Sequence, residues 1–253
     1  HPLCKLVRAL HAAKGRREHK LFMVEGSHAV LAAIEARWPL QHLLATPDDI
    51  VAQWQNLERA GDIEVQPVSA ELLEYLSDAG TSPGVIAIAA LPAAPVVDWS
   101  TQSLALVLDG INDPGNVGTL LRAADATGVG VVALTAGSAD AFGPKAVRAS
   151  AGSLFHLPLL QHEKLAPQNL IKLLNDQSIS IVAAAAHDGT SCYEYSWPRR
   201  CALVLGHETR GVSPEFEEAA TARVTIPIYG KAESLNVAAA GAVLLYAWRL
   251  QQS

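Results

Sequence analysis

The alternation of apolar and polar positions predicts two differently built parts of the chain. In the first 91 residues, short apolar runs such as Lys20–Val24 and Val85–Ala89 alternate with segments of helical apolar spacing, such as Cys4–Lys14. From residue 104 onward the apolar runs are nearly continuous, as in Leu104–Leu108 and Val131–Leu134. Runs of this kind between helices are typical of parallel strands buried on both faces. We therefore predict an α/β protein with a parallel sheet in its second half.

The same pattern predicts where the two parts meet. Residues 92–103 are rich in proline and small polar residues, which indicates a linker. This linker separates a small domain over residues 1–91 from a larger domain over residues 104–253. The other predicted elements are helices over His28–Arg37, Asp48–Arg59 and Ala70–Leu76, and strands over Leu43–Ala45, Ile63–Val65, Ser180–Ala185 and Ala202–Leu205.

The segment near the C-terminus predicts a buried helix. Ser234 is placed to cap a helix that begins near Leu235. This helix is apolar on nearly every side, and its first turns consist of small residues. Because a helix that is apolar all round is buried on all sides, a partner subunit is a candidate to cover one of its faces.

Composition excludes several classes of protein. The chain has 253 residues, of which 50% are apolar and 17% charged, so it is long enough for a large core and unlike a disordered chain. No apolar stretch reaches the roughly 18 residues that a membrane helix needs. The three cysteines, Cys4, Cys192 and Cys201, form no CxxC pair. We therefore expect neither a disulfide framework nor a metal site, and a reducing, cytoplasmic location.

Charge is distributed unevenly along the chain. The net charge is −6, yet the first 28 residues hold six Lys or Arg against two acids. A local basic patch on an acidic protein is typical of a phosphate-binding surface, and Lys14, Arg16 and Arg17 are its candidate RNA contacts. A solvated helix face explains the same charges equally well.

Residues 106–130, LVLDGINDPGNVGTLLRAADATGVG, hold the first candidate for chemistry. A strand ends at Asp109, and Asp113 and Pro114 then favour the start of a helix. Small Gly118 and Thr119 share a face with Arg122, which would let an anion approach the guanidinium. The string is neither GxGxxG nor a P-loop, so it supports no dinucleotide or triphosphate site. An ordinary helix with a solvent-facing arginine remains the alternative.

Two later segments place polar residues after apolar runs. In LVLGHETRGVSPE, residues 203–215, a strand leads directly into Gly206 and Glu208, and ligands of open parallel sheets bind beyond such carboxyl ends. Residues 224–248 place Ser234 and Asn236 before the last helix. A surface ion pair between Glu208 and Arg210, and simple helix capping, are the structural alternatives.

Taken in order, the three segments resemble the motifs of the SpoU/TrmH family, the SPOUT-class RNA 2′-O-ribose methyltransferases. The N-terminal part is similar to the ribosomal-protein-like substrate-binding domain of many members, through the run at residues 15–26 and Ser82-Pro83-Gly84. The motif residues are Asn112, Pro114, Asn116 and Arg122, then Leu205, Gly206, Glu208 and Gly211, then Ile226, Pro227, Gly230, Ser234, Leu235, Asn236 and Val237.

The resemblance implies both a fold and a cofactor. It implies a small α/β/α sandwich followed by a SPOUT domain with a deep trefoil knot and a dimer formed through the last helix. In the family, the knot loops hold S-adenosylmethionine. The positions that correspond here are Leu205, Gly206, Ile226 and Leu235.

The resemblance also assigns the catalytic positions, which are Arg122, Asn116, Glu208, Ser234 and Asn236. Because a guanidinium keeps its proton in proteins, we expect Arg122 to bind the target phosphate and stabilise a developing alkoxide rather than act as a base. Arg148, in the run KAVRASAG, is a candidate second phosphate contact, with a helix-surface arginine as the alternative.

The sequence thus favours an S-adenosylmethionine-dependent methyltransferase that modifies ribose 2′-OH groups, with ribosomal RNA as the expected substrate. Transfer RNA is the alternative substrate. A catalytically silent RNA-binding module is the alternative class, and the intact motif residues oppose it. A small-molecule enzyme that uses the crevice at Gly206 is disfavoured by the basic N-terminal segment.

Overall fold

The computed structural model describes residues 1–253 except 55–62, 80–82, 94, 162–164 and 253. The chain divides into two compact units. Unit 1 comprises His1–Ala93 and Asp140–His156, and unit 2 comprises Ala94–Ala139 and Leu157–Ser253. The sequence placed all of residues 104–253 in one domain, whereas the segment 140–156 packs within unit 1.

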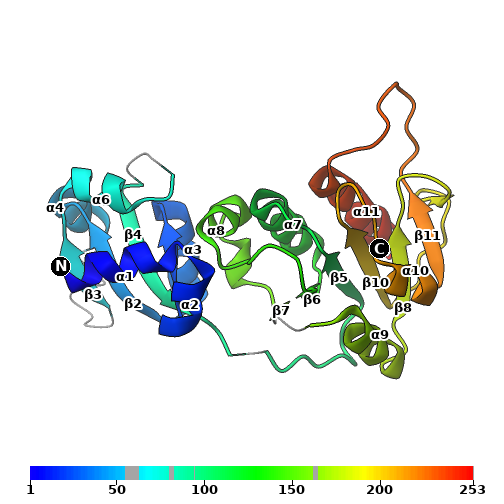
Figure 1. The fold of residues 1–253 in the computed structure, drawn as a ribbon, viewed down its shortest axis with the longest axis horizontal. Coiled ribbons are helices and arrows are strands. Elements are labelled where there is room, and N and C mark those ends of the chain that lie inside the picture. Colours follow the sequence, from blue (N-terminus) through cyan, green and yellow to red (C-terminus); the bar gives the residue numbers. More distant parts are fainter. Residues whose placement is uncertain (55–62, 80–82, 94, 162–164, 253) are drawn as a thin grey trace. The chain divides into compact units, whose positions relative to one another are not determined.

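Unit 1 is built on a four-stranded mixed sheet in the order β1-β4-β2-β3 (Figure 1). Strand β4 is antiparallel to both β1 and β2, and β2 is parallel to β3. The bounds are β1 Leu21–Glu25, β2 Leu40–Ala45, β3 Glu64–Pro67 and β4 Val85–Ala90.

The first predicted helix, Cys4–Lys14, is in fact two helices. The second helix folds back on the first, and a Cβ on Gly15 would lie only 2.1 Å from the Ala9 carbonyl oxygen. The predicted helix Asp48–Arg59 is replaced by a short α-helix and a π-helical turn, and its last five residues lie outside the described residues, as does Ser82. The helical segments are α1 Pro2–Leu10, α2 Ala13–His19, α3 Ser27–Glu35, α4 Pro47–Asp49, η1 Ile50–Trp54, α6 Ala70–Leu76, α8 Pro144–Ser150 and η2 Ser153–Phe155.

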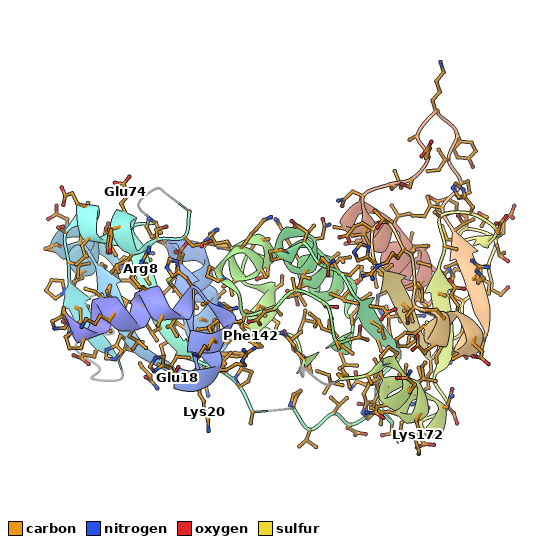
Figure 2. The ribbon with its side chains drawn as sticks, viewed as in Figure 1. Arg8, Glu18, Lys20, Glu74, Phe142 and Lys172 are labelled. Atoms are coloured by element: carbon orange, nitrogen blue, oxygen red, sulfur yellow. The ribbon has the colours of Figure 1, made fainter. Side chains whose placement is uncertain are left out.

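Side chains of β1 alternate between two cores, as the two-residue period of a strand requires. Leu21 and Met23 pack with α1 and α6. Phe22 points to the other face, where its ring lies 5.0 Å from the ring of Phe142, labelled in Figure 2, and 6.3 Å from that of Phe155. The predicted α/β/α sandwich is confirmed, and the segment 140–156 supplies part of its second helical layer.

Unit 2 contains a seven-stranded, wholly parallel sheet in the order β7-β6-β5-β10-β8-β11-β9. The predicted parallel sheet is therefore confirmed. The strands are β5 Leu104–Asp109, β6 Val131–Leu134, β7 Leu159–Gln161, β8 Ser180–Ala184, β9 Thr190–Ser191, β10 Cys201–Gly206 and β11 Ala222–Thr225. The helices are α7 Pro114–Thr127, α9 Pro167–Asp176, α10 Pro214–Ala219 and α11 Val237–Gln251.

Helices cover both faces of this sheet. Side chains of α9 and α10 pack with one face, where Leu174 and Phe216 are fully buried. On the other face α11 packs closely on α7 and β10. A Cβ on Gly241 would lie 2.3 Å from Leu120 Cδ2 and 2.7 Å from Leu205 Cδ1, so a larger residue here would require these two leucines to shift. Within the described residues, no helix combines the length and the apolar character needed to cross a bilayer.

The connection from β11 to α11 is an irregular loop that extends away from the rest of unit 2 (Figure 1). Ser234 lies in this loop and does not cap the helix, contrary to the sequence prediction. The cap is Asn236, whose side chain accepts the first free backbone N–H groups of α11. The trefoil knot stays a prediction.

Candidate functional site

Three of the sequence-predicted catalytic residues form one chain of hydrogen bonds. Asn236 Nδ2 donates to Asn116 Oδ1 over 3.1 Å, and Asn116 Nδ2 donates to Glu208 Oε1 over 2.9 Å. The three side chains come from the starts of α11 and α7 and from the loop after β10. Residues from three distant segments thus meet beyond the carboxyl ends of the strands, where open parallel sheets bind ligands.

Both asparagines take part in helix capping, Asn236 through its side chain and Asn116 through its backbone N–H. The side-chain oxygen of Asn236 accepts the backbone N–H groups of Ala238 and Ala239, over 2.9 and 3.3 Å. The backbone N–H of Asn116 donates to the capping carboxylate of Asp113 over 3.0 Å. Capping and site construction were alternatives in the sequence. The structure confirms the cap, since the side-chain oxygen of Asn236 caps α11, and its amide nitrogen also donates to Asn116.

His207 connects the loop after β5 with the loop after β10, although the sequence predicted no role for it. Its Nδ1 accepts the backbone N–H of Thr209 over 3.1 Å. Its Nε2 lies 2.9 Å from Nδ2 of Asn112. This contact ties the loop after β5 to the loop after β10.

A cavity of about 440 Å³ lies beside this polar chain. Its volume is in the range of sites for small molecules. All four predicted cofactor residues, Leu205, Gly206, Ile226 and Leu235, line it, together with Ser234 and Glu208. A Cβ on Gly206 would lie 2.1 Å from the backbone of Gly211 and Val212, so the strand end must be glycine for the loop to fold here. Among the described residues no cluster of ligands could hold a metal ion.

Arg122 lies on the exposed side of α7, and within the described part of the chain it makes no hydrogen bond or ion pair. The sequence placed Gly118 on the same open face as Thr119 and Arg122. That placement is wrong for Gly118, which is buried against the core. Arg122 is not bonded to the polar chain, and its guanidinium stays available to an anion.

Arg16, a predicted RNA contact, is a buried structural residue instead. It is only 4% exposed, and its Nε donates to Asp140 Oδ2 over 2.9 Å. Its Nη1 donates to the backbone carbonyls of Leu10 and His11. These bonds hold α1, α2 and the segment 140–156 together inside unit 1.

The structure also corrects the prediction for Arg148. It is neither an unpaired phosphate contact nor a simple helix-surface arginine, because it pairs with two carboxylates. Its Nη1 donates to Glu25 Oε2 over 2.7 Å and its Nη2 to Asp78 Oδ2 over 2.9 Å. The Glu25 side chain is 2% exposed and also accepts the backbone N–H of Asp78 over 2.8 Å. Arg148 therefore neutralises a buried carboxylate. Its engaged guanidinium is not free for an RNA phosphate.

Other predicted RNA contacts do lie on the surface of unit 1. Lys14 and Arg17 are exposed on α2. Lys20, which follows α2, is exposed and projects away from the ribbon in Figure 2. The exposed basic surface is therefore smaller than the sequence suggested, because Arg16 and Arg148 are not part of it.

The buried thiols lie in the core rather than at the polar chain. Burial raises the pKa of the Cys201 thiol, at the start of β10, to about 12. Burial also raises the pKa of Cys192. Both thiols therefore stay protonated near neutral pH and are poor nucleophiles.

Comparison with known proteins gives consistent matches over both units. A model described as the SpoU rRNA Methylase family matches residues 103–246, and one described as the MRM3-like substrate binding domain matches residues 1–87. The chain is 30% identical over 237 residues, 94% of this chain and 92% of the relative, to the 23S rRNA (guanosine(2553)-2′-O)-methyltransferase RlmP of Bacillus subtilis strain 168.

Two solved structures are also similar. The SpoU methyltransferase AviRb from Streptomyces viridochromogenes, in complex with the cofactor AdoMet, matches with 27% identity and a TM-score of 0.88, over 100% of this chain and 98% of that chain. A structure concerned with 2-OH methylation of C/U34 on tRNA matches with 29% identity and a TM-score of 0.51, over 60% of this chain and 97% of that chain.

Proposed function

Because the chain belongs to the SpoU rRNA methylase family, we propose that it transfers a methyl group from S-adenosylmethionine to a ribose 2′-OH of ribosomal RNA. The observation that carries the proposal is the bonded chain of Asn236, Asn116 and Glu208 beside the cavity. Residues of all three motifs thus converge on one place, which an accidental match of spacings would not produce.

The cavity suits the proposed cofactor. Leu205, Ile226 and Leu235 offer apolar walls to an adenine ring, and the irregular backbone at residues 226–236 offers polar groups. Gly206 keeps the backbone open to close approach. Bound there, S-adenosylmethionine would supply an electrophilic methyl group. That Leu205, Gly206, Ile226 and Leu235 hold it is part of the proposal.

The residues of the site would prepare the ribose. A 2′-OH is a poor nucleophile and must lose its proton as it attacks, so its oxygen must be held in line with the methyl carbon. Asn116, Asn236 and Glu208 already orient one another and could receive ribose hydroxyls without rearrangement. Ser234, exposed at the cavity wall, would add a hydroxyl from the loop before α11.

We propose that Arg122 binds the phosphate next to the target ribose and stabilises negative charge on the 2′-oxygen. A permanently charged guanidinium is suited to this role and not to that of a base. The pH dependence of Arg122→Lys tests the assignment. Similar pH profiles for the two proteins support it, and a steep loss of rate at high pH in the variant alone would show that the arginine takes the proton.

Ribosomal RNA is favoured over transfer RNA by the extent of the matches. The RlmP relative, named for a 23S rRNA nucleotide, aligns with 94% of this chain, whereas the tRNA-related structure covers 60%. In this proposal residues 1–91, joined to the rest through residues 92–103, bind the RNA substrate by shape and phosphate contacts. A ribosomal substrate also agrees with the cytoplasmic location expected from the cysteines.

Methyl transfer from labelled S-adenosylmethionine to total RNA from cells that lack this protein tests the proposal. We expect label in one ribosomal RNA, at a ribose 2′-oxygen, and none with Arg122→Ala. Label in transfer RNA would support the alternative substrate. No label, with S-adenosylmethionine binding intact by calorimetry, would overturn the enzymatic proposal in favour of a silent RNA-binding module.

We also propose that the protein forms a homodimer through α11. Tyr246 and Leu250 of this helix are 48% and 74% exposed, and they line an apolar hollow with Tyr193. Exposed apolar patches of this kind commonly mark interfaces. Sedimentation of the wild type and of Leu250→Glu tests this: a dimer that the substitution weakens supports it, and a wild-type monomer contradicts it.

A further inference from the structure

Asp109, the last residue of β5, is a buried carboxylate to which the proposed reaction assigns no task. It is 6% exposed, and among the residues that the structure describes no lysine or arginine pairs with it. Burying a carboxylate costs free energy unless hydrogen bonds compensate the lost water. Its partners are therefore informative.

The carboxylate has two hydrogen-bond donors from different segments. Thr135, just after β6, donates its hydroxyl to Oδ1 over 2.8 Å. Ser213, just before α10, donates its backbone N–H to Oδ2 over 2.7 Å. Asp109 thus links the carboxyl ends of β5 and β6 to the segment that follows β10.

The second link closes the loop of residues 206–213, which carries Glu208 and lines the cavity. The loop begins at Gly206, which pairs with Asp109 in the β5–β10 register, and it ends at Ser213. Between these ends it folds back on itself, because Gly211 adopts a φ of +72° and donates its N–H to the His207 carbonyl over 2.9 Å. Asp109 therefore lies beside the start of the loop in the strand register and bonds to its end through its side chain.

We propose that Asp109 is a positioning residue that fixes the loop 206–213 in the shape required to bind the cofactor. It acts through Gly206, Glu208 and Gly211 and touches no substrate itself. The part of this inference that concerns S-adenosylmethionine rests on the function proposed above. The part that concerns the loop rests on the hydrogen bonds alone.

Three substitutions separate this role from general support of the fold. Asp109→Ala removes both bonds of the carboxylate. Asp109→Asn keeps an oxygen for the Ser213 N–H and can donate to a rotated Thr135 hydroxyl. Thr135→Val removes the other bond of the same carboxylate and leaves the loop contact in place, so it is the matched control.

Calorimetric binding of S-adenosylmethionine is the first readout. We expect Asp109→Ala to raise its dissociation constant roughly tenfold or more, Asp109→Asn by about threefold at most, and Thr135→Val by about twofold at most. RNA affinity should not change in any of them. Equal weakening by Asp109→Ala and Thr135→Val, or no weakening by Asp109→Ala, would overturn the proposal.

Hydrogen exchange is the second readout, and it needs no ligand. The amides of Gly211 and Ser213 should exchange faster in Asp109→Ala than in Thr135→Val, even if the wild type binds no S-adenosylmethionine and the proposed function fails. Unchanged exchange at both amides would contradict the proposal that Asp109 fixes the loop 206–213. If Asp109→Ala does not fold, Asp109→Glu keeps the charge but displaces the carboxylate by one methylene, and the same results are expected of it.

Discussion

Both units carry arginines that the sequence marked as phosphate contacts, but the two units use them differently. In unit 1, Arg16 is 4% exposed and bonded to Asp140, and Arg148 is bonded to Glu25 and Asp78. In unit 2, Arg122 is exposed on α7 and bonded to no described residue. The first two arginines hold the fold of unit 1 together, and the third remains available to a ligand.

The difference shows which signal in a sequence carries function. Arg148 cannot leave the buried carboxylate of Glu25 without leaving it as an uncompensated charge, so this arginine contributes to stability rather than to RNA affinity. The polar chain of unit 2 consists mainly of amides placed at helix starts beyond strand ends. The family motifs name the three residues that the structure joins in this polar chain, whereas the count of basic residues overestimated the exposed basic surface of unit 1.

Arg122→Ala should give the largest effect. We expect methyl transfer to fall by about 100-fold to 1,000-fold, because a positioned charge opposite a developing oxyanion is lost. Binding of S-adenosylmethionine and the free energy of unfolding should not change. Arg199→Ala is the matched control, since Arg199 is exposed at the amino end of β10, opposite the strand ends that form the site. A comparable loss of methyl transfer in Arg122→Ala and in Arg199→Ala would contradict a specific role for Arg122.

Arg148→Ala should instead affect stability. The substitution leaves Glu25 buried without its cation, which should lower the free energy of unfolding by about 3 kcal/mol. Urea unfolding measures this, with Lys14→Ala as the control on the exposed surface of the same unit. A change below about 0.5 kcal/mol for Arg148→Ala would mean that the buried ion pair does not hold the segment 140–156.

Asn116→Ala and Asn236→Ala test whether the polar chain acts as a unit. Each should reduce the rate of methyl transfer by about 10-fold to 100-fold, and the double variant should lose less than the product of the two. Single-turnover rates of the four proteins give the coupling. Independent, multiplicative losses would show that the bond between the two amides has no catalytic role.

The two units also differ in their thiols, since Cys201 of unit 2 is buried and Cys4 of unit 1 is partly exposed. The pKa of Cys201 is raised from 9.0 to about 12, so the unfolded chain releases its proton at lower pH than the folded one. The free energy of unfolding should therefore be independent of this thiol below pH 9 and should fall as the pH rises from about 9 toward 12. Cys201→Ser should flatten that fall in urea titrations. Alkylation at pH 8 should reach the partly exposed Cys4 of unit 1 well before Cys201.

Lys14→Ala should have the smallest effect. It removes an exposed charge on α2, and we expect RNA affinity to fall a few-fold and the slope of log affinity against log salt to decrease by about one. Filter binding at several salt concentrations measures both. The same slope in Lys14→Ala and in wild type would exclude this part of α2 from the RNA surface.

Local pattern sufficed for much of the fold. The helix Ala70–Leu76 and the strand Val131–Leu134 have the predicted bounds, since propensity, capping and burial agree there. The break inside Cys4–Lys14 brings Gly15 against the Ala9 carbonyl, a close approach that the apolar spacing of this segment does not encode. Pro167–Asp176 went unpredicted although Leu170 and Leu174 have helical spacing.

Part of the candidate site was equally out of reach of the sequence. Asn116, Glu208 and Asn236 were found because their spacings match a family pattern. The partners of Arg16 and Arg148 lie more than 120 residues away along the chain for Asp140 and Glu25, and no local rule pairs them. His207 and Asp109 were missed for the same reason, because their roles arise from bonds between loops that only the folded sheet brings together.

The central claim is that catalysis resides in unit 2 while Arg16 and Arg148, paired with carboxylates in unit 1, serve the fold. The most direct test assays Arg122→Ala and Arg148→Ala together, with the methyl-transfer rate of each preparation divided by its folded fraction from circular dichroism. The account predicts that Arg122→Ala is fully folded and nearly inactive, and that Arg148→Ala is less stable but retains its rate per folded molecule. A stable Arg148→Ala without activity, or an active Arg122→Ala, would contradict it.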